Sequence, residues 1–189
     1  HGLFWGRGPI TVTGMLKPRL ACLLRTDCNL LAYHLPLDGH PQLGNNAVGL
    51  RRLGLSLDHA TGFATSPGAA IGLWTDTDPL EPIDLAERCR QAFDHPVIHC
   101  PGGPDQIRRI GMISGGGQSF LTEAAAIGLD ALVTGETSEQ TWHEARELGC
   151  HVFACGHHAT ECLAVHELGA ALALRFDLQH HPLPEDNPL

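Results

Sequence analysis

The last third of the chain alternates extended and helical patterns in a regular order, and this order constrains the fold more than any other feature. Short apolar runs typical of β-strands are expected over 109–113, 131–133 and 151–154, and each precedes a longer stretch with helical periodicity. Glycines stand near the expected helix ends, as C-cap chemistry predicts. This order predicts parallel strands with right-handed crossovers, and therefore an α/β fold whose sheet is largely parallel in its C-terminal part.

The first part of the chain carries further elements between prolines. Helices are expected over 17–29, 42–53 and 83–93, and extended segments over 30–34, 71–75, 97–100 and 107–113. The turn at 101–104 predicts either a hairpin or a lobe boundary. We therefore expect two intermixed α/β lobes, approximately 1–104 and 105–189, with a site at strand ends between them.

Composition restricts the class of protein. The chain has 189 residues, of which 43% are hydrophobic and 17% charged, so it can bury a substantial core. Its 21 acidic residues against 12 basic ones give a net charge of -9, which disfavours nucleic acid as the main partner. The seven cysteines show no C-x-x-C spacing, which argues against a disulfide framework and a cysteine zinc site. No apolar run approaches the roughly 20 residues of a membrane span and no secretory leader is seen, so the cytoplasm is expected.

Two pairs of an imidazole and a carboxylate stand out. His157 and Glu161 are four residues apart, and so are His34 and Asp38. On a helix this spacing places both side chains on one face, where they can converge on one divalent ion. The ligand type suits zinc, iron, manganese or nickel.

Each pair also has a purely structural interpretation. A histidine before a helix and an acid in its first turn, as in His157 and Glu161, are common because the helix dipole stabilises the acid. Asp38 can simply begin a turn, although it follows an expected strand, where functional side chains concentrate.

Two further features leave alternatives open. The glycines at 115–117 precede an expected helix and could bind an anion through backbone amides, or could allow close backbone packing. Glu136 and His143 lie at and after a strand end, and could act as a proton-transfer pair or in substrate contact, or stand exposed at the start of a helix. They are the candidate catalytic residues.

Five motifs occur along the chain in a fixed order. They are HGLFW at 1–5, HLPLD at 34–38, GMISGGG at 111–117, LVTGE at 132–136 and GHHATE at 156–161. Together they make the chain similar to the Nif-three-like dinuclear metal centre family, often labelled GTP cyclohydrolase I type II homologues. The resemblance runs along nearly all of the sequence.

The resemblance implies a centre of two divalent metal ions. Its ligands would be His1, Asp38, His157 and Glu161, with His34 either a ligand or a residue that orients one; His1 is assigned by resemblance alone. Family members carry a His-His pair before the first glycine, of which only the second is present here, and about sixty residues upstream, roughly one small half-domain. We therefore expect a fragment of one Nif-three-like unit, which by resemblance assembles as a homohexameric ring.

The expected function is that of a metal-dependent hydrolase that acts on a small molecule, with a metal-bridging hydroxide as nucleophile. One alternative is a non-catalytic metal-binding or scaffold protein that stores or delivers metal or forms a ring for protein partners. A second alternative, a GTP cyclohydrolase-like nucleotide-ring hydrolase, comes only through the family's label.

Overall fold

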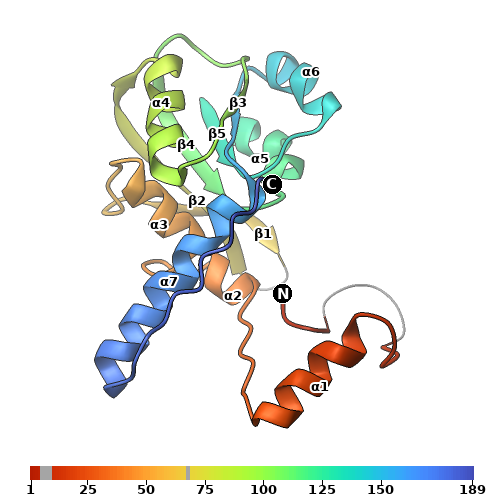
Figure 1. Ribbon diagram of the computed structural model, residues 1–189. Coiled ribbons are helices and arrows are strands. Elements are labelled where there is room, and N and C mark those ends of the chain that lie inside the picture. The colour runs from red at the N-terminus through yellow and green to blue at the C-terminus, as the bar shows by residue number, and fades with distance from the viewer. Residues whose placement is uncertain (5–9, 67–68) are drawn as a thin grey trace. The chain divides into compact units, whose positions relative to one another are not determined.

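The structure, a computed structural model, describes residues 1–4, 10–66 and 69–189. It comprises two units, His1–Pro36 and Leu37–Leu189, each described by itself (Figure 1). Trp5 of the first motif lies outside the described residues. The expected lobes 1–104 and 105–189 both contribute strands to one sheet, which lies within the second unit.

The first unit contains helix α1 (Leu16–Thr26), which confirms most of the helix expected over 17–29. The helix ends where Asp27 adopts a left-handed backbone conformation with φ 50°. The strand expected over 30–34 is wrong: these residues form no strand, and Leu30 and Leu31 are exposed. A short apolar run forms a strand only where another strand pairs with it, which the run itself does not reveal.

The second unit is built on a six-stranded sheet in the order β1-β2-β4-β5-β6-β3. Its strands are β1 (Thr61–Ser66), β2 (Ala69–Leu80), β3 (Ile98–Cys100), β4 (Ile107–Ile113), β5 (Ala131–Thr134) and β6 (His151–Ala154). Strands β4, β5 and β6 run parallel, as expected, while β1 with β2, β2 with β4, and β3 with β6 are antiparallel. The predicted α/β class is therefore confirmed, with a mixed sheet.

One local pairing differs from the expectation. The segments 97–100 and 107–113 form no hairpin, because β3 pairs with β6 at one sheet edge while β4 lies between β2 and β5. Strand β1 was not predicted. Pairing partners distant in sequence are set by the packing of the whole sheet, which local patterns do not encode.

Helices cover both faces of the sheet (Figure 1). The helical segments after α1 are α2 (Leu35–Asp38), α3 (Asn45–Arg52), α4 (Pro82–Phe93), the 3₁₀ turn η1 (Gly117–Phe120), α5 (Leu121–Ala126), α6 (Glu139–Leu148) and α7 (His157–Phe176). Leu50 of α3 and Leu85 of α4 pack with Phe153 on one face, whereas Leu121 of α5 and Ala145 of α6 pack with Val152 on the other. The neighbouring β6 residues 152 and 153 thus point to opposite faces, as the pleat of a strand buried on both sides requires.

Helix caps locate the ends of the elements around the site. Ser138 and Thr141 form a capping box at the start of α6, which ends at Gly149 with φ 70°. Helix α7 continues through Gly169 to Phe176 and, at 20 residues, is the longest described helix. None of the described helices combines the length and apolar character that a bilayer span requires.

Candidate functional site

Three loops that follow the parallel strands meet at one edge of the sheet, where ligands collect in folds of this kind. They are 114–117 after β4, 135–138 after β5 and 155–156 after β6. The amides of Gly135 and Glu136 both donate to the Gly115 carbonyl oxygen, at 2.9 and 3.0 Å. The Gly156 amide donates to the Gly135 oxygen at 2.9 Å. Backbone hydrogen bonds therefore fix the loops relative to one another before any ligand binds.

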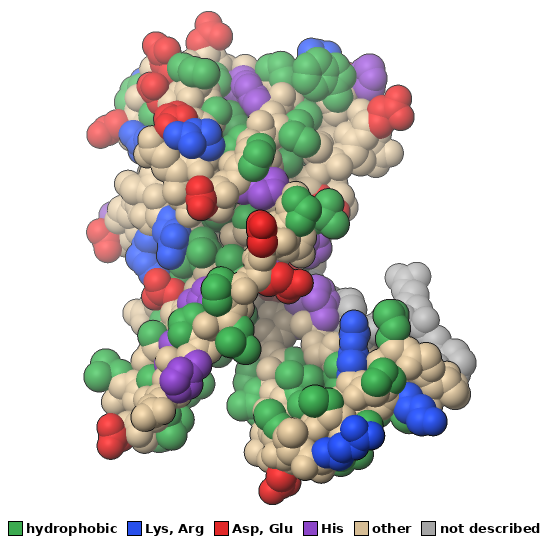
Figure 2. All heavy atoms as spheres, viewed as in Figure 1, with side chains coloured by type: hydrophobic (Ala, Val, Ile, Leu, Met, Phe, Trp, Pro, Cys, Tyr) green, Lys and Arg blue, Asp and Glu red, His purple; other side chains and the backbone are tan. Residues whose placement is uncertain are grey.

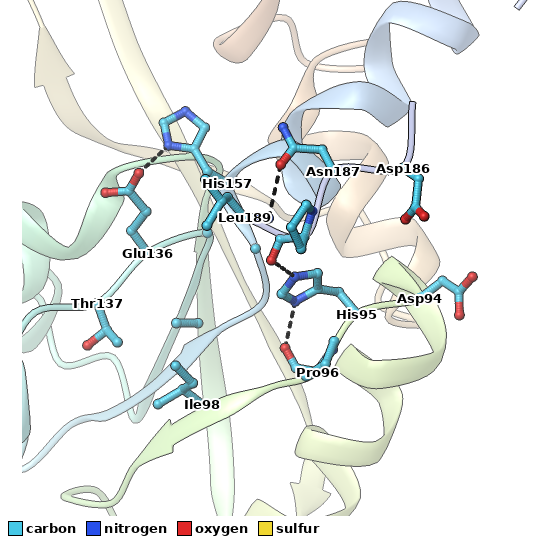
Figure 3. A pocket seen from close by; sticks show the side chains of 14 residues that line it. Asp94, His95, Pro96, Ile98, Glu136, Thr137, His157, Asp186, Asn187 and Leu189 are labelled. Atoms are coloured by element: carbon cyan, nitrogen blue, oxygen red, sulfur yellow. Dashed lines mark hydrogen bonds and ion pairs between the residues drawn. The ribbon is translucent and has the colours of Figure 1, made fainter. Parts of the chain in front are cut away.

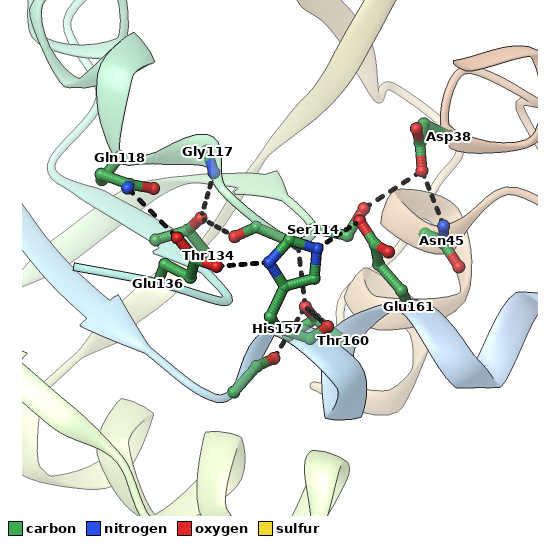
Figure 4. A network of polar contacts seen from close by, with 12 residues as sticks. Asp38, Asn45, Ser114, Gly117, Gln118, Thr134, Glu136, His157, Thr160 and Glu161 are labelled. Atoms are coloured by element: carbon green, nitrogen blue, oxygen red, sulfur yellow. Dashed lines mark hydrogen bonds and ion pairs between the residues drawn. The ribbon is translucent and has the colours of Figure 1, made fainter. Parts of the chain in front are cut away.

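His157, the first residue of α7, lies between two carboxylates (Figure 4). Its Nδ1 is 2.5 Å from Oε1 of Glu136, and its Nε2 is 3.4 Å from Oε1 of Glu161. A carboxylate only accepts, so Nδ1 donates its proton to Glu136, and in the neutral ring Nε2 then carries a lone pair. Two lone-pair-bearing atoms would face each other at Glu161, and this contact is stabilised only by a proton or a cation between them.

Glu161 lies one turn along α7 on the same helix face, with its side chain 25% exposed. Burial raises the pKa of its carboxyl group, the nearby His157 lowers it, and the charge of Asp38 raises it again. Asp38 and Glu161 therefore interact as like charges, and a bound cation would relieve their repulsion.

Asp38, at the end of α2, is buried with 7% exposure. Its Oδ1 accepts hydrogen bonds from Asn45 Nδ2 at 2.6 Å and from Ser114 Oγ at 3.3 Å (Figure 4). The fully buried Asn46 donates to the Asp38 carbonyl at 3.2 Å and accepts from the Ser114 amide at 2.8 Å. These three polar residues, which the sequence analysis missed, fix the carboxylate against the end of β4.

Gly115 allows the close approach of α7 to the loop after β4. It adopts φ +61°, and a Cβ there would overlap Glu161 Oε1 and lie 2.9 Å from His157 Nε2. Its amide donates to Thr160 Oγ1 at 3.0 Å. The Gly117 amide likewise donates to the buried hydroxyl of Thr134, on β5, at 3.0 Å. The two amides are thus engaged internally, which favours close packing over the anion-binding interpretation of this glycine run.

The structure places the candidate residues in two groups. Asp38, His157 and Glu161 belong to one polar network in the second unit. His1 and His34 belong to the first unit, with ring centroids 4.1 Å apart.

The two candidate catalytic residues, Glu136 and His143, have different surroundings. Glu136 contacts His157, and its Oε2 lies 3.5 Å from Gln118 Nε2. His143 is exposed on α6, and within the described part of the chain no hydrogen bond or ion pair joins it to Glu136. The geometry assigns Glu136 the positioning of an imidazole.

A pocket of about 660 Å³ opens beside the Glu136–His157 pair (Figure 3). Thr137 and Ile98 line it on the sheet side, and His95 lines it from the segment after α4. Its charged lining consists of carboxylates and imidazoles, without Lys or Arg among the described lining residues. On the face drawn in Figure 2, the described Lys and Arg side chains stand singly or in small groups rather than as one basic surface.

Comparison with known proteins gives consistent matches. The model of the family Duf34/NIF3 (NGG1p interacting factor 3) matches residues 1–188. A Yersinia pestis protein named GTP cyclohydrolase 1 type 2 homolog is 41% identical over 189 residues, which cover all of this chain and 74% of that protein. A Pseudomonas aeruginosa protein of the same name is 43% identical over 190 residues, with the same coverage.

Two solved structures are similar to this chain in both sequence and fold. A protein called ybgI, described as of unknown function, superposes with a TM-score of 0.89 at 38% identity over 98% of this chain and 73% of its own. A protein from Thermus thermophilus gives a TM-score of 0.84 at 32% identity over 96% of this chain and 71% of its own.

Proposed function

Because the chain belongs to the Duf34/NIF3 family, we propose that it binds two divalent metal ions and acts as a metal-dependent hydrolase. The observation that carries the proposal is the arrangement of His157, whose Nδ1 proton is held by Glu136 while Nε2 faces the Glu161 carboxylate. Histidines that bind metals are commonly oriented by such a carboxylate on the other ring nitrogen.

The donor set fits a borderline divalent cation. Asp38 and Glu161 supply carboxylate oxygens and His157 an imidazole nitrogen, which suits zinc, iron, manganese or nickel. The like-charge interaction of the two carboxylates supports the same conclusion, since a cation would remove its cost. On family membership alone, His1 would add a fourth ligand and His34 would act as a ligand or orient one.

Bound divalent ions would supply Lewis acidity and would lower the pKa of coordinated water. The residues of this chain have roles of their own. Glu136 keeps the proton on Nδ1 of His157, and Asn45 and Ser114 hold Asp38 in one orientation. The pocket beside Glu136 provides space for a small-molecule substrate.

A non-catalytic role in metal storage, delivery or scaffolding is the main alternative. An open coordination position that faces a pocket would favour chemistry over this alternative, and the described pocket is lined by His157 but not by Asp38 or Glu161. A GTP cyclohydrolase-like activity is suggested by the names of the relatives. The described pocket lining, with Asp94, Glu136 and Asp186 and without Lys or Arg, gives a triphosphate no counter-charge of its own. The hexameric ring and the cytoplasmic location stay predictions.

Metal analysis combined with anomalous diffraction tests the proposal. We expect two ions per chain, lost together in Asp38→Asn and Glu161→Gln variants. Metal-loaded protein should then hydrolyse a member of a panel of phosphoester, amide and purine-ring substrates. Stoichiometric metal without turnover on the panel would support storage or scaffolding, and failure to bind any divalent ion would remove both hypotheses.

A further inference from the structure

The segment Asp186–Leu189 folds back onto the start of α7 and lines the pocket beside the Glu136–His157 pair (Figure 3). It is therefore part of the wall of the pocket, although it belongs to neither the sheet nor a helix. We call this segment the strap.

The strap is held through its backbone. The carbonyl oxygen of Leu189 accepts a hydrogen bond from the His158 amide at 3.0 Å, in the first turn of α7. The carbonyl oxygen of Pro188 lies 3.1 Å from Nε2 of His95 and accepts a hydrogen bond from it when that nitrogen carries a proton (Figure 3). Hydrogen bonds to backbone carbonyl oxygens do not depend on the identity of the side chains, so the same donors could bind the backbone of another extended peptide.

The groove for the strap is built into the fold. The His95 ring lies against Gly156, where a Cβ would come within 2.9–3.0 Å of three ring atoms. Nδ1 of His95 is 2.7 Å from the Pro96 carbonyl oxygen, so both ring nitrogens face carbonyl oxygens, and both contacts are hydrogen bonds together in the doubly protonated ring. A residue with a side chain at position 156 would displace the ring, and its φ of +92° also favours glycine.

The strap itself is weakly anchored. Its turn is closed internally, since the Leu189 amide donates to Asn187 Oδ1 at 3.0 Å. The side chains of Asp186, Pro188 and Leu189 are exposed, with Leu189 at 75%. Little apolar surface is buried, and the net free energy of single hydrogen bonds is small, so the segment can leave without disturbing the core.

We propose that the groove formed by His95, Gly156 and the first turn of α7 is a binding site for extended peptide backbone, which the strap occupies as a ligand within the same chain. A free peptide of the same sequence competes for the groove, and removal of the strap enlarges the pocket beside His157. The proposal concerns backbone recognition and does not depend on metal or on hydrolysis.

The test uses a fluorescein-labelled peptide with the sequence of residues 184–189 and measures fluorescence anisotropy in buffer containing a metal chelator. A variant lacking residues 184–189 should bind the peptide saturably, at least tenfold more tightly than the intact chain. In that shortened variant, His95→Ala should weaken binding at least threefold, whereas His59→Ala, at an exposed histidine outside the pocket, should not.

A folded shortened variant that binds no peptide, or that binds as well with His95→Ala, would overturn the proposal. If the shortened chain does not fold, hydrogen exchange of the intact chain decides instead. There His95→Ala should speed exchange of the His158 amide at least fivefold relative to His59→Ala, and an unchanged rate would refute the role of His95. Because metal is absent throughout, neither result bears on the proposed hydrolase.

Discussion

The orientation of His157 by Glu136 is the most direct test of the proposed metal centre. Glu136→Ala removes the acceptor 2.5 Å from Nδ1, so the ring can rotate and its tautomer is no longer fixed. Hydrogen bonds to charged groups contribute about 1.5–3 kcal/mol. The Glu136 side chain is 47% exposed, so we take the lower value, about 1.5 kcal/mol.

At about 1.4 kcal/mol per factor of ten, this loss weakens metal binding about tenfold. That value is at the lower end of the 10–100-fold range for residues that orient ligands. Glu136→Gln keeps an oxygen acceptor but loses the charge, and charge-assisted bonds are about twice as strong as neutral ones, so about a threefold loss is expected.

The assay is a competition titration of Zn²⁺ or Mn²⁺ against a chelator of known affinity. Glu139→Ala, which removes an exposed carboxylate in the first turn of α6, is the matched control and should bind as the wild type does. If Glu136→Ala binds metal within twofold of the wild type, Glu136 does not orient a metal ligand and the assignment of His157 loses its main support.

Three further outcomes follow from the geometry. Glu161→Gln should raise the melting temperature of the metal-free protein at neutral pH, because a carboxyl group whose pKa is raised by burial costs stability once it is ionised. Calorimetry should also show that added metal no longer stabilises the Glu161→Gln variant. Gly115→Ala should weaken metal binding in the same titration, since its Cβ would displace Glu161 Oε1, and unchanged affinity would contradict the described packing. Burial and the neighbouring His151 lower the pKa of His99 below 6.5, so the unfolded chain binds the proton first and the unfolding free energy should fall as pH drops below about 6.5. His99→Gln should flatten this slope in thermal melts between pH 7.5 and 5.

Local signals predicted the last third of the fold well. Strands β5 and β6 fall close to their expected positions, and helix α6 follows β5 as expected, because each is a short apolar run or an amphipathic stretch bounded by turn or cap residues. The apolar run over 30–34 has the same local pattern and was therefore predicted as a strand, but no other strand in the described part of the chain pairs with it and it forms none. Strand β1, with the sequence TGFATS, is short and half polar because it lies at a sheet edge, where one neighbouring strand suffices.

In the site, too, local features could be predicted from the sequence, whereas contacts between distant residues could not. The spacing of His157 and Glu161 is a local property, so one helical turn was enough to predict that both side chains share a face. The partners of Asp38 could not be found this way. Ser114 is 76 residues away in sequence, and Asn46 acquires its role only when α3 packs against the end of β4. A buried asparagine stands out only once burial is known, since in sequence it resembles a turn residue.

The network that holds the candidate ligands is made by residues that would not themselves touch a metal. Asn45 and Ser114 donate to Asp38, and Glu136 accepts from His157. The attraction between His157 and Glu161 is opposed by the burial of Glu161 and by the charge of Asp38, both of which raise the pKa of the Glu161 carboxyl group. The scaffold therefore holds two carboxylates in place against their mutual repulsion, at a cost that a cation would remove. A site assembled by the metal would lose its geometry when the metal leaves, whereas this one would keep Asp38 and His157 oriented for the next ion.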